Sequence, residues 1–165
     1  MTMKASTKKR AVRTTTAPDA IALLKDDHAK VSAMFKQYDK LGDKAHATKL
    51  ELARRICKEL KVHTQIEEEI FYPATRAALP KEDDLLDEAQ VEHDGAKDLI
   101  RQLDAMKPED DFFDAKVTVL GEYIKHHVKE EHEEMFPKVR KTDLDLKELG
   151  MRMAFRKEEL ARQLG

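Results

Sequence analysis

Apolar residues recur along this chain at alternating steps of three and four residues, a spacing that places them on one face of an α-helix. Turn signals predict a first helix that opens near Pro18 and closes at Leu41-Gly42-Asp43. Because a proline disfavours a continuing helix, the second helix is expected to end before Pro73 and the fourth before Pro137. The second, third and fourth helices are predicted over about 45–71, 83–106 and 110–136.

Each of these four predicted helices carries a single apolar stripe, and the loops between them are short. Helices with one apolar face and short connections pack as antiparallel neighbours around a shared core. We therefore expect an all-α fold. Residues 17–138 would form an up-down-up-down four-helix bundle, and residues 139–165 an additional C-terminal helix.

The additional helix has an apolar stripe of its own, made of Leu146, Leu149, Met153, Leu160 and Leu164. By topology it begins at the end of the bundle that lies nearer the histidines described below. One interpretation is that it packs along the bundle or pairs with a second copy to form a homodimer. The other is that its first turn, from Leu144 to Leu149, partly covers the entrance for a ligand.

Polar residues interrupt all four apolar stripes of the bundle. Each stripe carries a histidine where an apolar residue is expected, and two stripes also carry a glutamate. An ionised carboxylate in a core is costly unless it is paired or binds a metal. Residues four apart lie on one helical face, so each histidine-glutamate pair can serve the same ion or neighbouring ions. The six candidate metal ligands are His28, His63, Glu67, His93, His127 and Glu131.

The two halves of the bundle repeat each other, as two copies of one helical hairpin would. Each half supplies a lone histidine from its first helix and a histidine-glutamate pair from its second. An acidic residue precedes the lone histidine in both halves, as Asp27 and Glu92, and these positions are 65 residues apart. His63, Glu67 and Pro73 match His127, Glu131 and Pro137, 64 residues later.

Imidazole and carboxylate ligands without a thiolate suit iron, manganese, zinc or copper. Two glutamates shared by four helices suggest two ions bridged by both carboxylates. Each ion would then keep open positions for water, an oxo group or a small ligand such as dioxygen. Such a centre is reactive and is not a closed structural site.

Several neighbouring residues offer alternatives. His126 and Glu130 have the same four-residue spacing as His127 and Glu131, although the apolar stripe and the repeat favour the second pair. His132 falls off the stripe and is expected to be solvated or to support another ligand. His46 is expected on the surface. Glu68 and Glu69 are expected to be solvated, although one of them could be a spare ligand. Packing roles are expected for the three tyrosines, Tyr38, Tyr72 and Tyr123.

Composition narrows the class of protein. The 165 residues suffice for one ordinary domain, and 39% of them are charged, which suits amphipathic helices with solvated outer faces. No stretch approaches the roughly 18 consecutive apolar residues of a membrane span, so no membrane partner is expected. The single Cys57 cannot form an internal disulfide, which favours a reducing compartment such as the cytoplasm.

The N-terminal residues differ from the rest of the chain. Residues 1–16 contain five basic residues, no acidic residue and several Ser and Thr. This composition predicts a disordered basic tail. Because neither interleaved aromatic residues nor a DNA-reading motif accompanies the charge, no nucleic-acid partner is expected.

Four segments together resemble the hemerythrin-like HHE cation-binding domain family, in particular its bacterial branch. They are Asp27-His28, HTQIEEEIFYP (63–73), EHDGAK (92–97) and HHVKEEHEEMFP (126–137), and the resemblance covers about residues 18–138. It implies a non-haem centre of two iron ions, with an oxo or hydroxo bridge, although another divalent metal would suit the same ligands. It also implies a small ligand: dioxygen, nitric oxide or peroxide.

The chain departs from the oxygen-carrying hemerythrins at two positions. Those proteins have a second histidine one turn after the third-helix histidine, where this chain has Lys97, and they use His-x4-Asp where it has His127-x3-Glu131. These departures argue against stable, reversible carriage of oxygen. Because the sequence contains no dedicated substrate-pocket motif, a binding or sensing module for dioxygen or nitric oxide is the first functional hypothesis. A di-iron enzyme acting on peroxide or dioxygen is the second. An interaction protein whose histidines only pack is the third.

Overall fold

The computed structural model describes residues 18–165, which fold into helices with no strand among them. The predicted disordered tail over residues 1–16 lies outside this range. None of the helices so described combines the length and the apolar character needed to cross a bilayer. The helical segments are α1 (Ala20–Asp39), α2 (His46–Ile66), η1 (Glu67–Phe71), α3 (Tyr72–Ala78), α4 (Asp83–Asp104), α5 (Phe113–Glu130), η2 (Glu131–Met135), α6 (Phe136–Arg140) and α7 (Leu146–Leu164).

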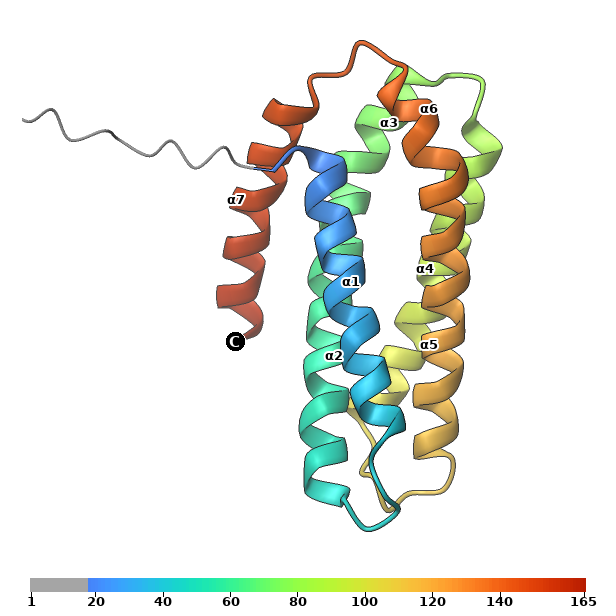
Figure 1. Ribbon diagram of the computed structural model, residues 1–165, viewed down its shortest axis with the longest axis vertical. Helices are drawn as coiled ribbons and strands as arrows, with labels where there is room; N and C mark the ends of the chain where they lie inside the picture. The colour runs from blue at the N-terminus through green and yellow to red at the C-terminus, as the bar shows by residue number, and fades with distance from the viewer. Residues whose placement is uncertain (1–17) are drawn as a thin grey trace, which may run out of the picture.

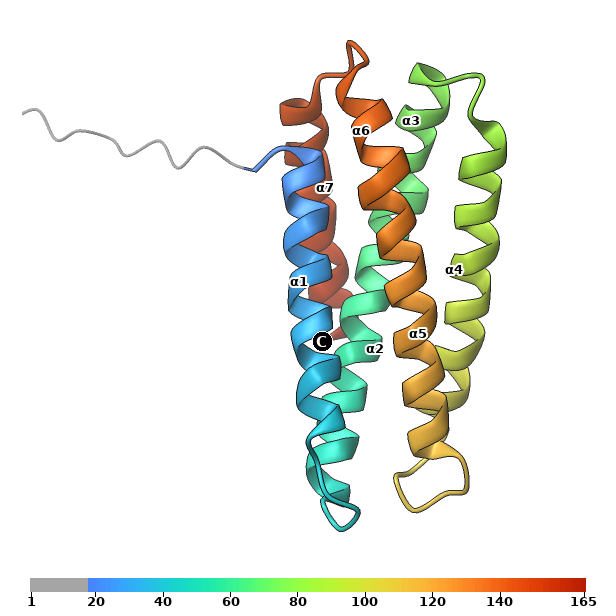
Figure 2. The ribbon, with the colours of Figure 1, turned by 45° about the vertical axis from the view of Figure 1, so that its right-hand side comes forward.

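Four long helices, α1, α2, α4 and α5, stand side by side (Figures 1 and 2). Helix α1 packs against α2 and α5, and α4 packs against α2 and α5. The short helices α3 and α6 extend α2 and α5 at the same end of the molecule (Figure 1). Helix α7 lies outside this group, against α1, α2 and η1.

The core consists of two apolar clusters stacked along the long helices. One contains Leu24 of α1 and Ala89 of α4, and the other contains Val31 of α1 and Ala96 of α4. In each of these helices a histidine falls between the two clusters, because one helical turn separates each histidine from the apolar residues on either side. A polar layer therefore crosses the bundle between two apolar ones.

The prediction that the second and fourth helices end before Pro73 and Pro137 is wrong. Both chains of hydrogen bonds continue past the proline, as α3 and α6, after one turn of π-helix. In the first of these turns the backbone N–H of Tyr72 donates to the carbonyl of Glu67, five residues earlier. Each proline occupies the first turn of the following α-helix, a position where its missing N–H and fixed φ are tolerated.

Helix α7 is fastened along the side of the bundle. Asp145 caps its N-terminus by accepting from the backbone N–H of Glu148 at 3.0 Å. Gly150 lies so close to the start of α1 that a Cβ there would be 2.6 Å from the carbonyl oxygen of Pro18. Of the predicted stripe, Leu149, Met153 and Leu160 are buried, whereas Leu164 is exposed.

Candidate metal centre

The six candidate ligands meet in the polar layer between the two apolar clusters. They come from α1, α2, η1, α4, α5 and η2, and each helix contributes through the stripe on which the sequence places it. All six side chains are buried, and Glu67 is fully so. Metal-ligating residue types from four directions thus converge on one interior volume.

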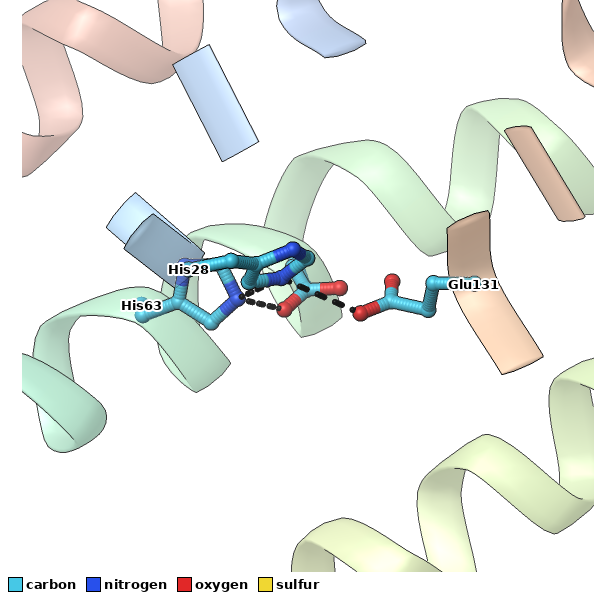
Figure 3. Close-up of side chains that lie close together, drawn as sticks. His28, His63 and Glu131 are labelled. Atoms are coloured by element: carbon cyan, nitrogen blue, oxygen red, sulfur yellow. Dashed lines mark hydrogen bonds and ion pairs between the residues drawn. The ribbon is translucent and has the colours of Figure 1, made fainter. Parts of the chain in front are cut away.

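The ligand atoms fall into two groups that share Glu67. The first group is His28, His63, Glu67 and Glu131, and the second is Glu67, His93 and His127; within each, the ligand atoms lie within 4.8 Å of one another. Figure 3 shows His28, His63 and Glu131 pointing toward a common point. His28 Nε2 is 3.1 Å from His63 Nε2 and 3.3 Å from Glu131 Oε1.

The second group is equally tight. His93 Nε2 and His127 Nε2 are 3.1 Å apart, and His127 Nε2 is 3.1 Å from Glu131 Oε1. Glu67 Oε1 contacts His63 Nε2 and lies 3.9 Å from His93 Nε2. The two carboxylates therefore lie between two pairs of histidines, an arrangement that suits two adjacent cations.

Several of these atoms lack a hydrogen-bonding partner of their own. Both carboxylate oxygens of Glu67, Oε1 of Glu131 and Nδ1 of His93 are buried without a well-oriented hydrogen bond from any described residue between 18 and 165. Leaving a buried charged oxygen unsatisfied is strongly unfavourable, so native structures rarely do it. The donor set and its orphaned oxygens fit a metal.

Protonated imidazoles and ionised carboxylates offset each other's charge in the centre. Burial lowers the pKa of His63, but the carboxylates of Glu67 and Asp27 outweigh it and raise that pKa to about 10. Burial also lowers the pKa of His127, but the charge of Glu131 outweighs this effect and raises that pKa to about 11. Burial raises the pKa of Glu131, yet the charge of His127 holds it well below the ordinary value. A bound metal would take the place of these protons.

An acidic residue holds the outer nitrogen of a ligand histidine in each half of the molecule. His63 Nδ1 lies 3.1 Å from Asp27 Oδ2, and His127 Nδ1 lies 3.4 Å from Glu92 Oε1. Such outer partners fix the tautomer and the ring orientation of a metal ligand. Asp27 in turn contacts Lys157 of α7, which ties the C-terminal helix to the centre.

The outer nitrogens of the other two histidines face residues of the opposite half, and His28 alone of the two is within hydrogen-bond distance. His28 Nδ1 lies 2.8 Å from His132 Nε2, and His93 Nδ1 lies 3.9 Å from Glu68 Oε1. Lys97 Nζ donates to both carboxylate oxygens of Glu68, at 2.6 and 2.5 Å. The structure thus gives His132 and Glu68 supporting positions, and each follows a candidate ligand directly in the sequence.

Tyr72 was not predicted from sequence as part of this centre. Its hydroxyl lies 3.2 Å from His93 Nε2 and 3.1 Å from His127 Nε2, and it donates to Glu131 Oε2 at 3.4 Å. Burial and the charges of Glu131 and Glu67 raise its pKa well above 10. The residue 64 positions later is Phe136, whose ring stacks on His28 with centroids 6.0 Å apart.

The remaining histidines stay outside the centre. His126 is largely exposed and faces Glu130 and Glu92 on the outer surface, which agrees with the register that selects His127 and Glu131 as the inward pair. His46 is also exposed, near the loop at the opposite end of the bundle, beside Glu109.

A small cavity adjoins the candidate ligands. Its volume is about 10 Å³, and it is lined by the four histidines together with Asp27, Thr64 and the apolar side chains of Val31, Leu60, Ile124 and Val128. This space holds about one water-sized probe. The space beside the candidate ligands is therefore about the size of one water molecule.

Comparison with known proteins identifies the family to which this chain belongs. Residues 19–139 match the family described as the Hemerythrin HHE cation binding domain. The chain belongs to this HHE family. A hemerythrin HHE cation-binding domain-containing protein of Mycobacterium kansasii has a similar structure, with a TM-score of 0.74 and 25% identity over 88% of this chain and 89% of that one.

A second relative of this HHE protein is a DNA nickase of Nostoc sp., 28% identical over 118 residues, which make up 72% of this chain. The match covers 32% of the nickase, so the HHE chain spans about a third of that relative's length.

Proposed function

We propose that this HHE protein holds two iron ions in an up-down-up-down four-helix bundle. His28 and His63 would serve one ion, His93 and His127 the other, and Glu67 and Glu131 would lie between them. The observation that carries this proposal is the fully buried Glu67, whose carboxylate accepts no well-oriented hydrogen bond from residues 18–165 and whose Oε1 contacts the candidate ligand His63. A carboxylate in that state is expected in a protein that binds cations there.

The ligand of this centre is proposed to be dioxygen, nitric oxide or a related small molecule. An iron pair would supply the electrons and open coordination positions for binding such a ligand. The chain itself supplies a cavity of about 10 Å³ with apolar walls from Val31, Leu60, Ile124 and Val128. These walls keep bulk water away and limit the ligand to a few atoms. Sensing or handling of oxygen or iron would follow from that binding.

Metal analysis tests the iron proposal. We expect protein from iron-rich medium, or protein loaded anaerobically with ferrous iron and reoxidised, to hold about two irons per chain, because its ligands are imidazole and carboxylate without thiolate. Iron content by mass spectrometry and a near-ultraviolet absorption band of ferric iron are the measurements. A chain that stays free of metal after this loading would refute the proposal.

An enzyme acting on peroxide or dioxygen is a second candidate function, supported by Tyr72. Its hydroxyl is a proton donor that already lies among the ligand atoms. Peroxide turnover by the iron-loaded protein, followed as released dioxygen, distinguishes the two functions. Continued release over many equivalents supports the enzyme, whereas uptake of a fixed number of ligands per chain supports the binding module.

Replacing Tyr72 with phenylalanine tests the part played by the hydroxyl. We expect Tyr72→Phe to keep the fold, since the buried ring is retained. The iron held by His93 and His127 should bind roughly tenfold more weakly, as happens when a metal site loses a supporting partner. The absorption spectrum of the iron-loaded protein should also change. The control is Tyr123→Phe, because Tyr123 is half exposed on the outer surface. Identical iron affinity and spectra in Tyr72→Phe and wild type would contradict the expectation.

A further inference from the structure

Three potential metal ligands converge on the outer surface of the second half, outside the buried centre. They are Glu92 of α4 and His126 and Glu130 of α5, and one ligand atom from each lies within 4.8 Å of the others. His126 Nε2 is 3.1 Å from Glu130 Oε1 and 3.8 Å from Glu92 Oε2. The histidine and glutamate are four residues apart, so they share one face of α5.

The equivalent positions in the first half of the molecule have different surroundings from these three residues. Asp27 is the counterpart of Glu92, and its carboxylate contacts Lys157 of α7. The counterparts of His126 and Glu130, 64 residues earlier, are Val62 and Ile66, which are buried in the same cluster as apolar residues of α7. Helix α7 packs against α1, α2 and η1, all of the first half, and supplies Lys157 beside Asp27 there.

The corresponding surface of the second half carries negative charge without a matching cation. Among residues 18–165, neither Glu92 nor Glu130 has a lysine or arginine within ion-pair distance. Other acidic residues next to the centre are paired: Glu68 with Lys97, and Glu69 with Arg156. Two converging carboxylates with only an imidazole between them attract a cation.

Open space lies directly beside these three side chains. They line one part of a hollow of about 800 Å³ between α4 and α5, which is also lined by Val91, Gly95 and Tyr123. An ion held by the three ligands would therefore keep further coordination positions free for water. That geometry matches an accessible metal site with three protein ligands.

We propose that Glu92, His126 and Glu130 form a third cation site, distinct from the buried centre, which binds one divalent transition-metal ion such as Zn²⁺ or Fe²⁺. One imidazole and two carboxylates suit these ions better than Mg²⁺ or Ca²⁺. The ion fills the role that Lys157 plays in the other half. The site also communicates with the inner centre, because Oε1 of Glu92 lies 3.4 Å from Nδ1 of His127 while its Oε2 faces the outer ion.

Zinc titration of the folded, chelator-washed protein tests the third site. By isothermal calorimetry, the Glu67→Ala variant, whose inner centre is impaired, is expected to bind one Zn²⁺ ion at the outer ligands. In that background His126→Ala and Glu130→Gln each weaken this ion by at least about tenfold. The control is His46→Ala, which removes a partly exposed histidine that has a single acidic neighbour. Circular dichroism checks that the exposed substitutions leave the fold intact.

Either of two results overturns the proposal: no zinc bound at the outer ligands, or equal zinc affinity in His126→Ala and His46→Ala. The proposed iron function fails separately, because it depends on the iron content of the wild-type chain. If the wild-type chain binds no iron but His126→Ala still weakens zinc binding, the third site is supported and the iron function is refuted.

Discussion

Replacing Glu67 with alanine is expected to remove most of the iron from the protein. Glu67 is fully buried, and it is the one residue common to both groups of candidate ligands. Its loss deprives both ions of a ligand, so iron affinity should fall by more than about a hundredfold, beyond the effect of losing an outer partner of a ligand. The measurement is iron per chain after anaerobic ferrous loading, reoxidation and washing with chelator.

The matched control for this substitution is Glu134→Ala. Glu134 lies in η2 with Glu131, but its side chain is exposed. Iron content should therefore match that of wild type. Equal losses of iron from Glu67→Ala and Glu134→Ala would show that net charge, and not the buried position, governs metal binding.

Ending the chain after Lys141 is expected to lower the free energy of unfolding by about 5 kcal/mol. The truncation removes α7, whose Leu149, Met153 and Leu160 are buried against the bundle. Burial of each such side chain contributes about 1.5–3 kcal/mol. Urea denaturation of the metal-free protein, followed by circular dichroism, is the measurement.

If the truncated chain does not fold, a single substitution within α7 still tests the packing of this helix. Leu160→Ala should cost about 2–5 kcal/mol, as large-to-small changes in a core do. Leu164→Ala, one turn later and 44% exposed, should change stability by less than about 0.5 kcal/mol. Equal stability of these two variants would contradict a packing role for α7. Faster nitric oxide binding by an iron-loaded truncated chain would support the hypothesis that its first turn covers a ligand entrance.

The position of the candidate ligands could be predicted because each one breaks a regular pattern. A histidine such as His93 stands between Ala89 and Ala96 on a stripe that is otherwise apolar, and the second half of the chain repeats the first. The helical fold follows from the same periodicity. Both inferences need only which residues share a helical face, and a sequence provides that directly.

Other parts of the centre depend on geometry that periodicity does not contain. Tyr72 lies five residues after Glu67, and in a regular α-helix such a residue points about 140° away from it. The π-helical turn between them brings the tyrosine hydroxyl to the ligands, and glutamate-rich segments give no clear signal for such a turn. Asp27 and Glu92 were recognised as matching positions of the repeat, but the sequence did not predict their contacts with His63 and His127, since acidic residues beside a stripe resemble a solvated face.

Tyr72 in the first half corresponds to Phe136 in the second half. This difference makes the two sides of the centre unequal along the line that joins its two pairs of histidines. The backbone and the ligand types are duplicated, yet His93 and His127 face a hydroxyl, whereas His28 faces a bare aromatic ring. The tyrosine hydroxyl thus adds to the differences in outer partners that distinguish the two sides of a nearly repeated cage. Two chemically identical ions bound there would differ in acidity and in the ease with which each loses an electron. Swapping the two ring types would move the hydroxyl to the other side of the centre without altering any of the six candidate ligands.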